Sequence, residues 1–184
     1  MRTEVRITGI GGQGAISMGH VLGMAAVLYD GKEAVVTEGY SPYITGGWSR
    51  ADVVISDEPI DYPAVSELDA LVTMYQDGLD TNLKLLRKRG IIVAEKRLVT
   101  MSGSHGGRAY SVPAAEAADG LGKKVLTNVV LLGSLVAITR FVSKSSVEKA
   151  LADRFPRAVE LNIRALSAGH ELGSRLVAKG GTEK

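Results

Sequence analysis

The sequence predicts an α/β domain with a Rossmann-like, doubly wound and mostly parallel β-sheet and a helical C-terminal half. Strand-like and helix-like segments alternate over the first half of the chain, as in folds whose strands are joined by helical crossovers. The strand segments are rich in Val and Ile, which is typical of parallel strands buried on both faces. A turn of closely spaced glycines follows the first strand, as it does at many phosphate-binding turns.

The composition is that of one globular domain, which we expect to span residues 1–184. The formal net charge is +2, from 22 basic and 20 acidic side chains, and this near-balance predicts no nucleic-acid surface. The chain has no cysteine, which excludes disulfides, thiolate metal sites and cysteine nucleophiles. The longest strongly apolar run, residues 128–139, is too short to span a membrane. We therefore expect a cytoplasmic protein without a signal peptide or membrane span.

Two segments define the start of the fold. Val5 and Ile7 alternate with polar residues and predict a first strand over 3–10. Apolar residues recur at helical spacing over 15–29. Gly19 and Gly23 share one face of this helix, and we expect them to let the helix lie very close to the sheet.

Strands and loops continue this alternation up to residue 95. The pattern predicts strands over 32–38, 51–57, 68–75 and 91–95, a loop over 40–50, and a helix over 80–90 that ends at Gly90. The basic trio at residues 87–89 is expected at the end of that helix, where cations complement the helix dipole.

Helices dominate after residue 96. We predict a loop with one short strand near Tyr110, and then helices over 114–121, 128–141 and a pair across 145–178 that Pro156 interrupts. Ser145 or Ser146 is expected to cap the first helix of this pair. The apolar helical half either completes the fold or mediates assembly.

The glycine turn has two interpretations. Gly9, Gly11 and Gly14 form G-x-G-x-x-G directly after a strand and before a helix, where the amides of the helix N-terminus point at an anion. Alternatively, the glycines only permit tight packing of the strand on the helix. Gly12 and Gln13 complete the run G-G-Q-G, and the glutamine either faces a ligand or braces a neighbouring loop.

A dinucleotide-binding dehydrogenase fits the sequence less well. The acidic residue that contacts a ribose in such sites is matched only loosely, by Glu38. A free-standing NAD dehydrogenase also needs a substrate domain and an acid–base residue, for which little chain remains.

Histidine and serine offer no reactive group of recognisable spacing. The histidines stand far apart in the sequence, at His20, His105 and His170. They lack metal-ligand spacing, so we predict no metal site. Ser102 and Ser104 lie beside His105 but lack the G-x-S-x-G turn of a serine nucleophile. No catalytic residue is therefore predicted.

Two further groups of polar residues have structural explanations. Asp57, Glu58 and Asp61 lie where a strand ends, and turn carboxylates are ordinarily solvated. Asn128 begins the most apolar helix and is most simply its N-cap, although a ligand role remains open.

Four segments recur in the same order in one known family. They are GIGGQG (9–14), TGGWSRADVVISDEPID (45–61), LDALVTM (68–74) and NVVLLGSLVAIT (128–139). From about residue 3 to about residue 173 the chain resembles the gamma subunit of 2-oxoacid:ferredoxin oxidoreductases, a family that includes pyruvate, 2-oxoglutarate and ketoisovalerate enzymes. The resemblance implies a subunit, inactive alone, of a complex that decarboxylates a 2-oxoacid oxidatively, forms acyl-CoA and reduces ferredoxin.

The resemblance also implies how cofactors are divided among subunits. In that family, thiamine diphosphate is held by alpha- and beta-type subunits, and iron–sulfur clusters by the beta-type and a small ferredoxin-like subunit. This chain is then expected to hold no cofactor tightly, to help clamp coenzyme A as a substrate of the complex, and to assemble with those subunits into a hetero-oligomer served by ferredoxin. The alternative is a stand-alone Rossmann-type nucleotide-binding or regulatory domain.

The second loop departs from the family pattern. The family shows R-G-G where this chain has Thr45-Gly46-Gly47, so Arg50 either replaces the missing arginine or the contact is lost. A missing cation disfavours 2-oxoglutarate, whose second carboxylate needs one. The aromatic residues of the loop, which are Tyr40, Tyr43 and Trp48, indicate a bulkier oxoacid, a subunit contact or simple anchoring of the loop. The candidate ligand-contacting residues are Gly9, Gly11, Gly12, Gln13, Gly14, Thr45, Gly46, Gly47, Arg50 and Asn128.

Overall fold

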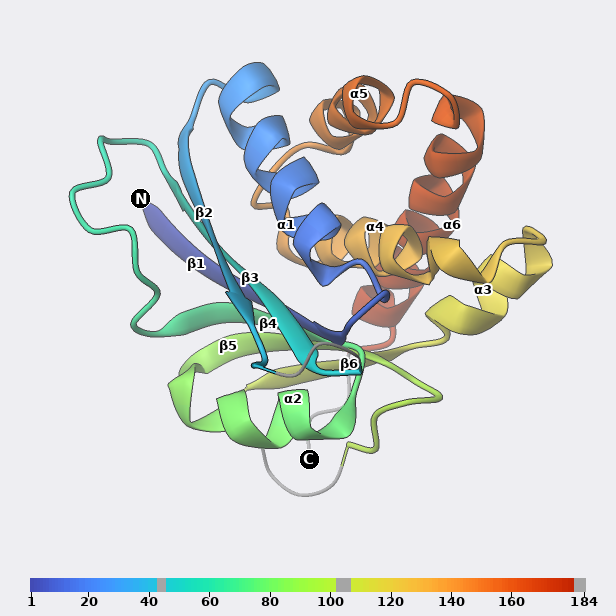
Figure 1. Ribbon diagram of the computed structural model, residues 1–184, viewed down its shortest axis with the longest axis horizontal. Coiled ribbons are helices and arrows are strands. Elements are labelled where there is room, and N and C mark those ends of the chain that lie inside the picture. Colours follow the sequence, from blue (N-terminus) through green and yellow to red (C-terminus); the bar gives the residue numbers. More distant parts are fainter. Residues whose placement is uncertain (43–45, 102–106, 181–184) are drawn as a thin grey trace.

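A computed structural model describes residues 1–42, 46–101 and 107–180 as a six-stranded sheet covered by helices (Figure 1). The strands are β1 (Arg2–Ile10), β2 (Glu33–Tyr40), β3 (Trp48–Ser56), β4 (Leu68–Thr73), β5 (Leu86–Glu95) and β6 (Arg108–Val112). Their order is β2-β3-β1-β4-β5-β6. β1, β4, β5 and β6 pair in parallel, whereas β3 is antiparallel to both β1 and β2. The predicted α/β fold with a mostly parallel sheet is confirmed.

The helices form two layers on one face of the sheet and a thin cover on the other. They are α1 (Ala15–Met24), α2 (Gln76–Asn82), α3 (Ala114–Gly120), α4 (Thr127–Thr139), α5 (Lys144–Arg154) and α6 (Val159–Ala178). A π-helical turn, η1, extends α1 over Ala25–Tyr29. α1 and α4 lie on the sheet, α5 and α6 pack outside them, and α2 lies on the opposite face (Figure 1).

α4 is buried on all sides between the sheet and α6, including every residue from 129 to 137. The apolar C-terminal half therefore completes the fold, which was one of the two alternatives. In the described part of the chain, no helix combines the length and apolarity that crossing a membrane requires.

The two faces of β1 differ sharply in chemistry because successive strand residues point to opposite faces. Val5 and Ile7 join the main apolar core with α1 and α4. Glu4, Arg6 and Thr8 point to the other face and are also buried. α2 covers this second face with a smaller apolar cluster over β4, β5 and β6. Under β1 and β3, the same face carries polar groups instead.

A buried ion pair organises this polar face. Arg6 donates to both carboxylate oxygens of Asp52, at 2.6 and 2.7 Å, and to the side-chain oxygen of Asn82 at 2.7 Å. Arg6 and Asp52 lie opposite each other on β1 and β3, and Asn82 comes from the end of α2. Paired geometry and the added amide bond offset the cost of burying both charges.

The helix glycines behave as predicted. A Cβ atom on Gly19 would lie 2.3 Å from the Cβ of Ala51 on β3, and one on Gly23 would lie 2.6 Å from Val36 on β2. Both distances are too short for real atoms, so α1 approaches the sheet as closely as glycine alone permits.

The helix predicted over 80–90 is wrong in its second half. α2 begins at Gln76 and ends at Asn82, a short 3-10 turn follows over Leu83–Leu85, and β5 already begins at Leu86. The basic trio therefore lies on a strand rather than at a helix end. Arg87 pairs with Asp69 at 2.7 Å across the neighbouring strand β4, a contact between distant segments that local helical spacing could not reveal.

Smaller differences concern element ends. β2 runs on to Tyr40 and β3 begins at Trp48, so both strands extend into the predicted loop over 40–50. α5 is capped by Ser143, whose hydroxyl accepts a hydrogen bond from the amide of Ser146 at 3.1 Å. Ser145 and Ser146 thus lie inside the helix that they were expected to cap.

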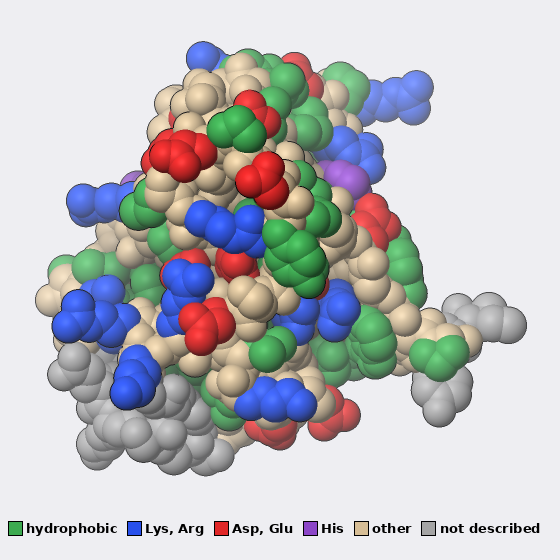
Figure 2. All heavy atoms as spheres, turned by 90° about the vertical axis from the view of Figure 1, so that its left-hand side faces the viewer, with side chains coloured by type: hydrophobic (Ala, Val, Ile, Leu, Met, Phe, Trp, Pro, Cys, Tyr) green, Lys and Arg blue, Asp and Glu red, His purple; other side chains and the backbone are tan. Residues whose placement is uncertain are grey.

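Charge is well mixed on the side of the molecule that Figure 2 shows. Lys and Arg side chains alternate with Asp and Glu there, in the part of the chain that the structure describes. This distribution agrees with the near-balanced net charge of +2.

Gly19→Ala should destabilise the fold although alanine favours helices. The added methyl group overpacks the contact with Ala51, which should lower the free energy of unfolding by about 1–3 kcal/mol in urea denaturation. Gly120→Ala is the matched control, because Gly120 ends helix α3 and its Cβ would meet no atom within 4 Å. Equal stability of the two variants would contradict close packing at Gly19.

Candidate functional site

The glycine turn connects β1 to α1 with backbone angles that require glycine. Gly12 and Gly14 have φ values of 90° and 79°, in the left-handed region that other residues rarely adopt. Gly14 is the N-cap of α1, and no side chain caps this helix. The amide dipoles of the first turn of α1 are thus directed at the space in front of the turn, where they favour an anion.

The second loop is tied directly to this turn. The amide of Gly11 donates to the carbonyl of Gly47 at 2.8 Å. Between the two loops lies a hollow of about 430 Å³, which we call the glycine-loop pocket. Its lining consists of Gly11, Gly12, Gly14, Ala15, Ile16, Ser17, Tyr40, Ser41, Gly46, Gly47, Trp48 and Ser49. Five of the predicted contact residues therefore come together here, while Thr45 and Tyr43 lie outside the described residues.

Three predicted contact residues support this pocket from behind. Gln13 accepts from the amide of Ile10 at 2.7 Å and donates to the carbonyl of Met74 at 3.3 Å, so the glutamine braces the turn against the end of β4. Gly9 leaves room for this brace, because a Cβ there would lie 3.0 Å from the Met74 side chain.

Asn128 is the third supporting residue and is not an N-cap. Leu126 holds the N-cap position of α4, and Asn128 lies in the first turn. Its amide nitrogen lies 3.5 Å from the carbonyl oxygen of Gly14 and would be 2.2 Å from a Cβ at that glycine. A glycine at position 14 is thus needed both for its φ angle and for contact with α4.

The arrangement of β2 argues against a dinucleotide site of the usual kind. β3 separates β2 from β1, so Glu38 lies two strands away from the glycine turn. Its carboxylate accepts a hydrogen bond from Tyr40 and lies 2.6 Å from the His20 ring nitrogen. Hydrogen bonds from Tyr40 and His20 lower the pKa of Glu38. The carboxylate expected to bind a ribose is already engaged within the protein.

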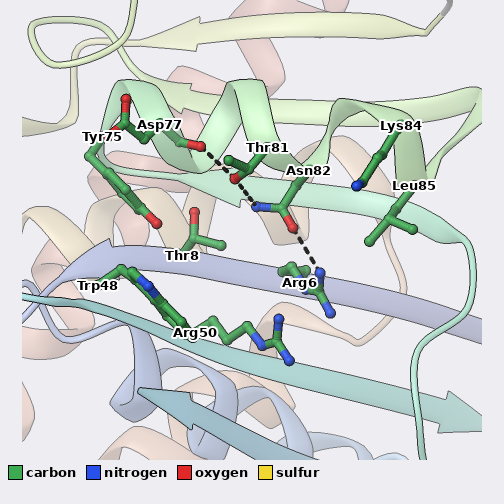
Figure 3. A pocket seen from close by; sticks show the side chains of 10 residues that line it. All are labelled: Arg6, Thr8, Trp48, Arg50, Tyr75, Asp77, Thr81, Asn82, Lys84 and Leu85. Atoms are coloured by element: carbon green, nitrogen blue, oxygen red, sulfur yellow. Dashed lines mark hydrogen bonds between the residues drawn. The ribbon is translucent and has the colours of Figure 1, made fainter. Parts of the chain in front are cut away.

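A second hollow, the polar-face pocket, lies between the polar side of β1 and β3 and the helix α2 (Figure 3). Its volume is about 510 Å³. The residues that line it are Arg6, Thr8, Trp48, Arg50, Tyr75, Asp77, Thr81, Asn82, Lys84 and Leu85. Most of these residues were not singled out from the sequence, although polar residues alternating with Val5 and Ile7 on a buried strand are a signal for such a face.

Arg50 belongs to the polar-face pocket and not to the glycine-loop pocket. It pairs with Thr8 across β1 and β3, on the face that carries Arg6 and Asp52. Its guanidinium lies 5.7 Å from the centre of the Trp48 ring and 3.6 Å from Asp52. Strand alternation directs Arg50 to the opposite side of the sheet from the glycine-loop pocket, and whether it replaces the missing R-G-G arginine stays a prediction.

Hydrophobic side chains are exposed around the edge where the glycine turn lies. Ile10, Tyr40 and Trp48 lie at the ends of the three adjoining strands and are each more than one third exposed. A further hollow of about 390 Å³, lined by Gly12, Gln13 and Met74 among others, exposes Leu98 and Val125 at its rim. A group of neighbouring exposed apolar side chains is typical of an interaction surface.

The other sequence candidates do not join a site. Asp57, Glu58 and Asp61 are exposed, as expected for turn carboxylates. Burial and nearby Lys144 lower the pKa of His170, a residue of α6 that lines a hollow together with Lys144 of α5. Among the described residues, no group of three or more histidines and carboxylates is placed to hold a metal ion. Ser102, Ser104 and His105 fall outside the described residues.

Comparison with known proteins gives a consistent result. The family model described as pyruvate ferredoxin/flavodoxin oxidoreductase matches residues 4–172. The chain is 40% identical over 180 residues to the 2-oxoglutarate synthase subunit KorC of Methanocaldococcus jannaschii, with 96% of each chain covered. It is 41% identical to KorC of Methanothermobacter marburgensis, covering 94% of this chain and 97% of the relative. The gamma subunit of a keto/oxoacid ferredoxin oxidoreductase from Geobacter sulfurreducens matches with a TM-score of 0.85 at 36% identity, covering 94% of this chain and 97% of that one.

Gln13→Ala and Gln13→Glu should separate the two halves of the brace. Alanine removes both hydrogen bonds, whereas glutamate keeps the acceptor for the Ile10 amide and loses the donor to Met74. We expect Ala to speed hydrogen exchange at the Ile10 amide and to lower stability by about 1 kcal/mol, and Glu to leave that amide protected. Unchanged exchange in the alanine variant would show that Gln13 does not brace the turn.

Proposed function

This chain belongs to the pyruvate ferredoxin/flavodoxin oxidoreductase family as a gamma-type subunit, and we propose that its complex is a 2-oxoglutarate:ferredoxin oxidoreductase in which the glycine-loop pocket holds phosphate groups of coenzyme A. In such a reaction the 2-oxoacid loses carbon dioxide, its acyl group passes to the coenzyme A thiol, and ferredoxin takes the electrons. Thiamine diphosphate and iron–sulfur clusters of the complex supply that chemistry. This chain contributes binding and assembly.

The observation that carries the coenzyme A proposal is the joined pair of glycine loops. A pyrophosphate needs several donors that converge without side chains in the way, and the uncapped first turn of α1 supplies them. The hydrogen bond from Gly11 to Gly47 holds the second loop against this turn. Because Gly12 and Gly46 have open space where a Cβ would point, a phosphate can approach the backbone there.

The choice of 2-oxoglutarate is supported by the relatives. Both archaeal relatives are subunits of 2-oxoglutarate synthases and are aligned over nearly their whole length. The threonine at position 45 had argued against a dicarboxylate. A cation that binds the second carboxylate can come from another subunit. The missing arginine at position 45 is therefore weaker evidence about the oxoacid than the similarity to 2-oxoglutarate synthase subunits.

The exposed apolar edge supports docking of partner subunits beside the glycine turn. The apolar residues of α4 are buried and contribute nothing to this contact surface. The exposed apolar side chains around the glycine turn are those of Ile10, Trp48, Leu98 and Val125. A coenzyme A molecule held there would thus lie at a subunit boundary, where it can reach chemistry that this chain lacks.

Purification of the tagged chain from its own cells tests the complex. We expect co-purifying subunits that carry thiamine diphosphate and iron–sulfur clusters, and reduction of ferredoxin that requires both 2-oxoglutarate and coenzyme A. The chain alone should show no turnover. If it is recovered alone, without such subunits, the proposed complex is wrong; if pyruvate is the better substrate, the assignment of the oxoacid is wrong.

Gly12→Ala should raise the KM for coenzyme A roughly tenfold in the complex, which corresponds to about 1.4 kcal/mol of binding free energy. The added methyl group would point into the pocket and leave the KM for 2-oxoglutarate unchanged. Gly31→Ala is the matched control, because Gly31 also has a positive φ, of 64°, and open space around its Cβ. Each variant should lose about 1–2 kcal/mol of stability from backbone strain. A KM increase of equal size in both variants would trace the effect to strain and contradict the pocket.

A further inference from the structure

The polar-face pocket has two chemically different ends. Trp48 and Tyr75 lie toward one end with Thr8 between them, Arg6 and Lys84 lie toward the other, and Arg50 extends from beside Trp48 toward Arg6 (Figure 3). Its volume of about 510 Å³ falls in the range of about 300–1,000 Å³ of small-molecule sites. A ligand that fills it would need an aromatic or apolar part and an anionic part.

The cationic end consists of the buried Arg6–Asp52 ion pair and two further cations, Arg50 and Lys84. Both oxygens of Asp52 are taken by Arg6, whose charge is thereby neutralised. Arg50 lies 3.6 Å from the same carboxylate, which already has a closer partner. Lys84 is exposed and forms no ion pair with another described residue. The ion pair of Arg50 with Asp52 is longer than that of Arg6 and its side chain is 41% exposed, so Arg50 and Lys84 can both reach an external anion.

The aromatic end can receive a planar ring. Trp48 is 39% exposed, and the Arg50 guanidinium lies 5.7 Å from the centre of its ring. Burial and the Asp77 carboxylate raise the pKa of Tyr75, which keeps its hydroxyl neutral and able to donate. Stacking between an aromatic side chain and a base contributes about 1–3 kcal/mol and tolerates any base.

We propose that the polar-face pocket is a binding site for a nucleoside phosphate, with the base between Trp48 and Tyr75 and the phosphate on Arg50 and Lys84. The site lies on the opposite side of β3 from the glycine-loop pocket, and it stands whether or not the chain assembles into the proposed complex. A free nucleotide and the adenosine phosphate end of coenzyme A share this chemistry. The structure thus provides two anion-binding places that Trp48 separates, since this residue lines both.

Fluorescence of Trp48 reports binding directly, because it is the only tryptophan of the chain. Adenosine monophosphate added to the isolated full chain should change the emission saturably. Calorimetry should show that Arg50→Gln and Lys84→Gln each raise the Kd about tenfold or more, as expected for loss of a charge-assisted contact to phosphate. Lys88→Gln is the matched control: Lys88 is an exposed cation of β5 that does not line the pocket. Inorganic phosphate should bind more weakly than the nucleotide.

Two further comparisons identify the source and the place of binding. If Arg50→Gln and Lys84→Gln also weaken coenzyme A, the ligand is the end of that molecule; if they weaken only the monophosphate, it is a free nucleotide. Gly12→Ala should leave monophosphate binding unchanged. The proposal is overturned if neither compound binds saturably, if both cation variants bind like the wild type, or if only Gly12→Ala weakens binding. None of these results depends on turnover, so they are separate from a failure of the proposed complex.

Discussion

The antiparallel register between β1 and β3 is the constraint on which the rest of the structure depends. It pairs the two strands over their full length, from Arg2 with Ser56 to Ile10 with Trp48. The loop before β3 is thereby brought to the end of β1, where Gly47 accepts the amide of Gly11. A slip by one residue would move every side chain of β3 to the other face.

The same register creates the difference between the two faces of the sheet. Ala51 and Val53 are directed toward α1, where the missing side chain of Gly19 makes room for them. Arg50 and Asp52 are directed away, toward Arg6 and α2. One strand thus supplies a wall of the apolar core and a wall of a polar pocket. A change of register between β1 and β3 would expose apolar residues and leave a buried charge without its partner.

The strand order also explains why the glycine turn does not form a dinucleotide site of the usual kind. Insertion of β3 between β1 and β2 carries Glu38 away from the turn, and Tyr40 and His20 occupy its carboxylate. The turn still presents the first amides of α1 to the space in front of it, because these donors belong to the backbone. It loses the ribose contact because that contact needs β2 as the neighbouring strand.

The sequence by itself determined the features that depend on neighbours along the chain: the position of most strands and helices, the glycine turn, the close approach of α1 at Gly19 and Gly23, and the complete burial of α4. Only the tertiary structure decided which segments meet. Residues 86–89 were expected in a helix but form the start of β5, where Arg87 pairs with Asp69 on β4. Arg50 stands three residues from Gly47, yet it lines a different pocket. Spacing along the chain predicts which residues share a face of a helix or strand. Which segment packs against that face depends on pairing between segments that are distant in the sequence.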